Sequence, residues 1–71
     1  MTNTSMLEQE INKSGYKRSY IADFLGISTY TLSMKIRNET KFKASEIEKL
    51  CKILGFEVNT RMAIFFANTV D

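Results

Sequence analysis

The stretch RSYIADFLGISTYTLSMKIR, residues 18–37, decides the fold. Its apolar residues indicate two short helices, over about residues 18–25 and 29–37, joined by a tight turn. Gly26 stands where the chain must turn sharply, usually with a positive φ that glycine adopts without a Cβ clash. Leu32 is placed to fall between the two helices. The stretch therefore predicts a helix-turn-helix.

Small and apolar side chains on both sides of the turn fit this motif. Ala22 is expected to face the following helix, where a larger side chain would hold the two helices apart. Leu32 is expected to lie in the wedge between them, beside Ile21, Leu25 and Ile27. A short chain with this motif at its centre is typical of a domain that recognises DNA sequence.

The remaining sequence predicts two or three more helices, and hence a single all-α domain of four to five helices over residues 1–71. The first helix is expected to begin at a capping box, Ser5 to Glu8, and to end near Gly15. A second possible box, Ser45 to Glu48, would open the fourth helix, which Gly55 closes.

Capping residues mark the ends of the third helix more clearly than the starts of the second and fourth helices. Ser28 can cap the third helix, and Asn38 suits a left-handed conformation at its end. Lys17 and Lys43 stand where Ser or Thr would more usually cap the second and fourth helices. The starts of those two helices are therefore less clearly marked.

The C-terminal tail, residues 57–71, is compatible with two structures. Thr60 can cap a short fifth helix over 60–67, which we prefer, but the alternation at 64–66 also fits an edge strand. A small helical domain has little room to bury the apolar side chains of Ile64, Phe65 and Phe66 together with that of Val70. The tail is thus expected either to pack across the first and fourth helices or to contact a partner or a second copy.

Composition limits the class of protein. A chain of 71 residues with 44% hydrophobic and 25% charged residues is typical of one small globular domain. One Cys and no His exclude an internal disulfide and argue against zinc or His-based catalysis, so we expect no enzyme activity, cofactor or metal. The sequence shows neither a membrane-length apolar run nor a signal peptide, which favours a cytosolic protein.

Positive charge is concentrated around the motif. The chain carries a net charge of +2, but residues 13–43 hold seven Lys and Arg against two acids, a net +5. A surface that faces phosphates explains this coincidence of charge and motif, and an unevenly charged solvated surface is the alternative. In the first case, the bases expected to face DNA are Arg18, Lys35, Arg37, Lys41 and Lys43.

Side chains that invite a chemical role have simpler explanations. Cys51 lies on the apolar stripe of the fourth helix with no His to activate it, so we expect a buried small apolar residue rather than a reactive thiol. Asp23 and Glu39 are expected to be solvated carboxylates and not an acid–base pair. Phe42 and Phe56, on either side of the fourth helix, are expected in the core.

The segment from Gly15 to Phe56 resembles the lambda-repressor and Cro-like helix-turn-helix family. Within it, LSMKIRNETKF and SEIEKLCKILGF are similar to a subgroup of small phage regulators, and the tail IFFANTVD fits that subgroup. The chain also looks like the modulator-of-repression proteins of temperate phages of Gram-positive bacteria, which are small partners of a repressor in a lysogeny switch. The resemblance implies a cofactor-free transcriptional regulator in the cytoplasm of a bacterial host.

The resemblance also implies that the third helix enters the major groove of operator DNA. Arg18 would reach a phosphate or a base edge from the preceding helix, and Lys41 and Lys43 would contact phosphates beside the groove. Hydroxyl and guanidinium groups can bind several base edges. The implied groove-facing residues are Ser28, Thr29, Tyr30, Ser33, Met34 and Arg37.

The same face is also suited to binding a protein. Between Ser28 and Met34 it lacks the Gln, Asn or Arg forks that the family often places there, each of which distinguishes bases by about 1–3 kcal/mol. Tyr and Met are enriched at protein interfaces. Two functions therefore remain open. One is a Cro-like operator binder, which would bind two-fold related half-sites about one DNA turn apart if the tail is a dimer contact. The other is an antirepressor that grips the DNA-binding domain of a phage repressor.

Overall fold

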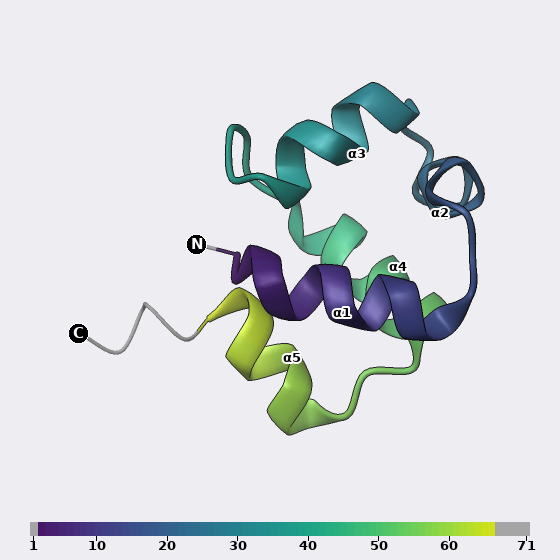
Figure 1. Ribbon diagram of the computed structural model, residues 1–71. Coiled ribbons are helices and arrows are strands. Elements are labelled where there is room, and N and C mark those ends of the chain that lie inside the picture. Colours follow the sequence, from purple (N-terminus) through teal and green to yellow (C-terminus); the bar gives the residue numbers. More distant parts are fainter. Residues whose placement is uncertain (1, 67–71) are drawn as a thin grey trace.

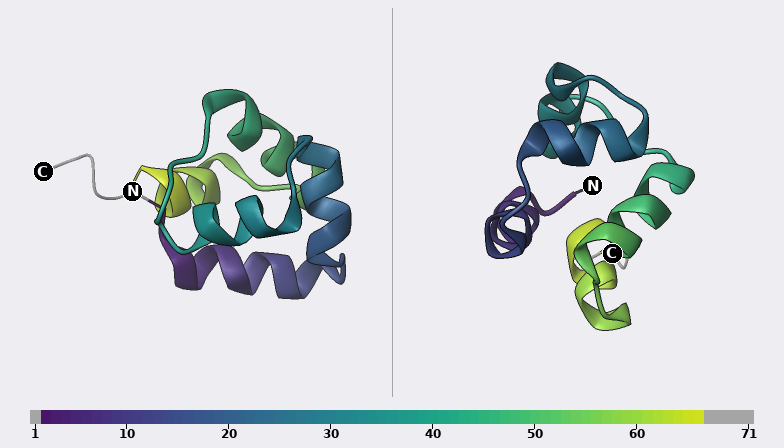
Figure 2. Two further views of the ribbon diagram at one scale, coloured as in Figure 1. Left: turned by 90° about the horizontal axis from the view of Figure 1, so that it is seen from above. Right: turned by 90° about the vertical axis from the view of Figure 1, so that its right-hand side faces the viewer.

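Residues 2–66, the part of the chain that the computed structural model describes, form five α-helices and no strand (Figure 1). The helices are α1 (Thr4–Ser14), α2 (Arg18–Leu25), α3 (Thr29–Ile36), α4 (Ala44–Leu54) and α5 (Val58–Phe65). The expected all-α fold is confirmed for these residues. Viewed from two directions, α3 and α5 lie on opposite sides of α1 and α4 (Figure 1 and Figure 2).

The tight turn predicted between α2 and α3 is confirmed. Gly26 has φ +79°, and the N–H of Ile27 donates to the carbonyl of Ala22 at 3.0 Å. Ala22 is 1% exposed and Leu32 is completely buried, as the close approach of the two helices requires. The turn therefore fixes α3 against α2 through one left-handed glycine and a small side chain.

The core is one apolar cluster to which all five helices contribute. Phe42 and Phe56 pack against it, with ring centroids 5.7 and 6.2 Å from the ring of Phe65. Both rings remain half-buried, so their predicted place in the core is confirmed only in part. The buried members are Leu7, Ile11, Ile21, Ala22, Leu25, Leu32, Ile36, Leu50, Ile64 and Phe65.

The N-terminus of α1 differs from the prediction. Asn3 caps the helix, because its side-chain oxygen accepts a hydrogen bond from the N–H of Met6 at 3.2 Å. Ser5 lies inside the helix, so the predicted Ser5 to Glu8 box is wrong. Asn and Ser are about equally good N-caps, and local sequence therefore did not separate them. The helix ends at Gly15, as predicted.

The starts of α4 and α5 also differ from the prediction. α4 begins one residue before Ser45, because the Glu46 carboxylate accepts a hydrogen bond from the N–H of Lys43 at 2.8 Å. This is one half of a capping box, with the acid three residues after the cap. α5 begins at Val58, so Thr60 lies within it and does not cap it.

The tail is helical where the structure describes it, as we preferred. Ile64 is completely buried, Phe65 is 4% exposed and Phe66 is half-buried. The carbonyl of Ile64 accepts a hydrogen bond from the N–H of Asn3 at 2.6 Å, which joins α5 to the start of α1. Ile64 and Phe65 therefore belong to the core and Phe66 packs against it, while Val70 lies outside the described residues.

Candidate functional site

The outer face of α3 lies at an edge of the molecule (Figure 1). Tyr30 is 70% exposed, and its side chain makes no hydrogen bond or ring contact with the described part of the chain. Thr29 is exposed, and Ser33 and Met34 are half-buried. Because Tyr30 and Met34 are four residues apart on a helix, they lie on the same side of α3.

Ser28 has a structural role at this face. Its hydroxyl oxygen accepts a hydrogen bond from the N–H of Thr31 at 3.0 Å, which confirms the predicted cap of α3. The Ser28 hydroxyl also donates to the hydroxyl of Thr31 at 2.9 Å. Its proton is therefore already used, and Ser28 is less suited to contact a ligand than its exposure suggests.

Both arginines of the predicted site are paired with carboxylates. Arg18 on α2 lies 3.8 Å from Glu8 on α1, and Arg37 lies 3.2 Å from Glu39. The guanidinium of Arg37 is also 3.8 Å from the sulfur of Met34. Exposed pairs of this kind contribute only about 0–1 kcal/mol, so a phosphate or a partner carboxylate can replace the acid.

Lys35 does not face solvent, which corrects the prediction that it faces DNA. Its side chain is 8% exposed and lies on the inner side of α3, with the ammonium 2.6 Å from Glu46 on α4. The same ammonium donates a hydrogen bond to the carbonyl of Lys41 at 3.1 Å. Its place three residues after Leu32, on the buried side of the helix, is the sequence signal that was missed.

Glu46 is the second residue that sequence reasoning did not identify. Burial raises the pKa of its carboxyl, but hydrogen bonds from the Lys35 side chain and the Lys43 N–H, together with the charges of both lysines, outweigh burial. The pKa of Glu46 is therefore lowered, and the carboxylate is charged at neutral pH. A buried acid and a buried lysine thus form an ion pair beneath the surface.

The segment between α3 and α4, which we call loop 37–43, carries the remaining basic side chains of this face. Lys41 and Lys43 are exposed. Within residues 2–66, neither ammonium makes an ion pair. These two lysines are therefore the cationic groups most available to a ligand at this face.

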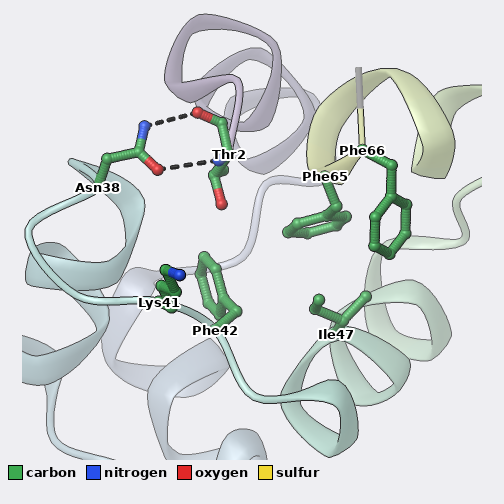
Figure 3. Close-up of a pocket in the computed structure, with 7 residues that line it drawn as sticks. All are labelled: Thr2, Asn38, Lys41, Phe42, Ile47, Phe65 and Phe66. Carbon is green, nitrogen blue, oxygen red and sulfur yellow. Dashed lines mark hydrogen bonds between the residues drawn. The ribbon is translucent and has the colours of Figure 1, made fainter. Parts of the chain in front are cut away.

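A pocket of about 190 Å³ lies between loop 37–43, α4 and α5. Figure 3 shows Asn38 joined to Thr2 by a pair of hydrogen bonds at its edge. The Asn38 amide donates to the Thr2 carbonyl at 2.6 Å, and its oxygen accepts from the Thr2 N–H at 2.9 Å. Asn38 has φ +66°, as predicted for the end of α3. The pocket is lined by Thr2, Asn38, Lys41, Phe42, Ile47, Phe65 and Phe66.

Cys51 is only partly buried, in contrast to the prediction of a buried core residue. Its thiol lies where α4 meets α5, near Arg61. Burial, and secondarily Glu48, raises the pKa of the Cys51 thiol, although Arg61 acts in the opposite direction. The protonated thiol is a poor nucleophile. Among residues 2–66 no three potential metal ligands cluster, and no helix has the length and apolar character of a membrane span.

The structure brings most of the predicted contact residues together. All except Arg18 lie on α3, its cap or loop 37–43, and Arg18 lies at the start of α2. Comparison of the chain with protein-family models, curated proteins and solved structures finds no significant match. We therefore infer the function from the geometry of this face.

Proposed function

We propose that the protein is a small helix-turn-helix transcriptional regulator that binds operator DNA through α3 and loop 37–43. The observation that carries this proposal is the division of α3 into two sides. Leu32 and Ile36 fix one side in the core, while Tyr30 on the other side is 70% exposed, and the exposed Lys41 and Lys43 follow the helix in the loop. The major groove of DNA admits an α-helix, and lysines at its flank would neutralise phosphates.

Each residue of the face has a separate role in this proposal. Thr29 and Ser33 would offer hydroxyls to base edges, and Tyr30 would contact a thymine methyl or a phosphate. Lys41 and Lys43 would bind phosphates. Arg18 and Arg37 would exchange Glu8 and Glu39 for phosphate oxygens, because their exposed pairs open at little cost.

Salt dependence tests the proposal. Each phosphate contact contributes about −0.9 to the slope of log affinity against log salt concentration, so the double substitution Lys41→Ala/Lys43→Ala should reduce the slope by about 1.8. Lys49→Ala/Lys52→Ala removes the same charge from exposed positions on α4 and is the matched control. Absence of binding to phage operator DNA at low salt, or equal effects of the two variants, would refute the proposal.

An antirepressor function is the second candidate, and the paired arginines favour it. Glu8 and Glu39 reduce the positive charge that Arg18 and Arg37 present, while Tyr30 offers a large exposed ring next to Met34. Aromatic and Met side chains are enriched in protein interfaces. In this case the same face would bind the DNA-binding domain of a phage repressor and prevent its contact with the operator.

A further inference from the structure

Loop 37–43 is held by polar contacts, because close packing does not fix it everywhere. The pocket of about 190 Å³ separates part of the loop from α5, and Lys41 and Asn38 lie on its polar side (Figure 3). Phe42 points inward and meets Phe65 edge to face, at 85° between the rings. Phe42 also packs against the core, and hydrogen bonds hold the loop backbone on either side of this ring, at Lys41 and Lys43.

One buried ion pair binds the backbone at both exposed lysines. The ammonium of Lys35 holds Glu46 at 2.6 Å and the carbonyl of Lys41 at 3.1 Å. The same Glu46 oxygen accepts the N–H of Lys43 at 2.8 Å. The pair therefore fixes the loop on both sides of Phe42, while the side chains of Lys41 and Lys43 remain exposed.

The N-terminal segment holds the other end of the loop. Thr2 pairs with the Asn38 side chain, and the Thr4 hydroxyl donates to the carbonyl of Ile36 at 2.5 Å. Asn3 joins the same segment to the carbonyl of Ile64 on α5. The last turn of α3 and the start of the loop are thus tied to α1 and, through it, to α5.

We propose that Lys35 and Glu46 are positioning residues, which hold the backbone of loop 37–43 so that Lys41 and Lys43 meet phosphates in register with α3. This inference rests on the proposed DNA-binding function. Neither residue touches the ligand, because both side chains are 8% exposed. Buried ion pairs often add little net stability compared with apolar replacements, so a role in fixing geometry accounts for the pair.

DNA affinity is the first test. Lys35→Met removes the ammonium but keeps an unbranched side chain only one atom shorter, and Lys49→Met removes an exposed lysine from α4 as the control. If Lys35 fixes two phosphate contacts, Lys35→Met should lower operator affinity about tenfold or more at 0.1 M salt. The control should change affinity by less than about threefold, since Lys49 lies outside the proposed interface.

A mutant cycle separates positioning from direct contact. Lys35→Met should have little further effect when Lys41→Ala/Lys43→Ala is already present, because the groups that it positions are gone. If Lys35→Met lowers operator affinity by the same factor with and without Lys41→Ala/Lys43→Ala, Lys35 acts independently of the two lysines, and the proposal is overturned. Lys35→Met/Glu46→Gln serves as a second variant that leaves no unpaired buried charge, in case the single variant does not fold.

Hydrogen exchange of the Lys43 amide tests the positioning without DNA. Its N–H donates to the Glu46 oxygen that the Lys35 ammonium holds in place. Without that ammonium, exchange of the Lys43 amide should be faster by about tenfold or more, in Lys35→Met or in the double variant, with the amides of α1 unchanged. Unchanged exchange at Lys43 in both variants would overturn the proposed positioning. Faster exchange in a protein that binds no operator DNA at low salt would instead refute the proposed function, and with it the role of the loop in DNA binding.

Discussion

The two sides of α3 differ more than any sequence pattern in its eight residues suggests. On the inner side, Leu32 and Ile36 are at most 1% exposed and Lys35 is held by an acid from α4. On the outer side, Tyr30 is 70% exposed, and its side chain makes no hydrogen bond or ring contact with the described part of the chain. The inner side maintains the fold, and the outer side is available for a ligand.

This difference has a physical origin in the two helices beside α3. The tight turn at Gly26 brings α2 close, and α1 also packs against α3, so one side of α3 is covered by two helices. No described helix covers Tyr30, which is why a large aromatic ring remains exposed there. Substitutions on the two sides should therefore change different properties.

The largest expected effect is on the inner side. Leu32→Ala should lower the free energy of unfolding by about 2–5 kcal/mol, because it leaves a cavity at a completely buried position. Tyr30→Ala, on the outer side of the same helix, should change it by less than about 0.5 kcal/mol. Urea unfolding of both variants checks the comparison. Equal losses would mean that the two sides of α3 are assigned incorrectly.

The turn that places α3 should be the next most sensitive position. Gly26→Val should lower the free energy of unfolding by about 1–3 kcal/mol, since a β-branched residue is strained at φ +79°. An added Cβ would meet no atom within 4 Å, so the loss comes from the backbone and not from a clash. Gly26→Asn should therefore be milder, because Asn tolerates this conformation. If thermal unfolding shows Gly26→Asn to be clearly less stable than Gly26→Val, this explanation is contradicted.

Substitutions on the outer side should affect binding more than stability. If the partner is a repressor, Tyr30→Ala or Met34→Ala should weaken the complex by about 1–2 kcal/mol. Neither change removes a charge, so non-specific DNA affinity should stay nearly constant, whereas Arg37→Ala should lower it. Titrations against repressor and operator separate the two functions. If Tyr30→Ala and Met34→Ala still bind the repressor but lose their sequence preference on DNA, the result supports the operator-binding function.

The buried pair predicts a smaller, pH-dependent difference. The pKa of Glu46 is lower in the folded protein than its ordinary value of 4.5, so its stabilising contribution is present above that pH. It is lost as the pH falls through the lowered pKa. Unfolding followed from pH 6 to about pH 3 should show a weaker loss of stability for Glu46→Gln than for the natural sequence. An identical pH profile for the two proteins would exclude this contribution.

The sequence predicted α2, the turn and α3 because their signals are local. A glycine at a turn, a Ser cap and apolar spacing act within a few residues of one another, and all three are confirmed. The burial of Lys35 has only a weak local signal, its place three residues after Leu32 on the buried side of the helix. This burial depends on Glu46, which lies 11 residues away on another helix, and in sequence Lys35 resembled any other base of a positively charged stretch.

The helix starts show the same limit at shorter range. Asn3 and Ser5 are both suitable caps for α1, and tertiary contacts of the N-terminal segment with Ile64 and Asn38 accompany the choice of Asn3. α4 begins without a capping side chain at its first position, because Glu46 bonds back to the Lys43 N–H. The exposed face of α3 was predicted from a family resemblance. The ion pair between Arg37 and Glu39 beside that face was not predicted.

The most direct test of the central claim is a map of backbone amide shifts during titration with operator DNA, and separately with the phage repressor. The proposed function predicts that DNA perturbs residues 28–43 most, with α5 nearly unchanged, because the outer side of α3 and loop 37–43 form the interface. The antirepressor function predicts the same residues with the repressor alone. Perturbations centred on α5, or none with either partner at low salt, would contradict the assignment of this face.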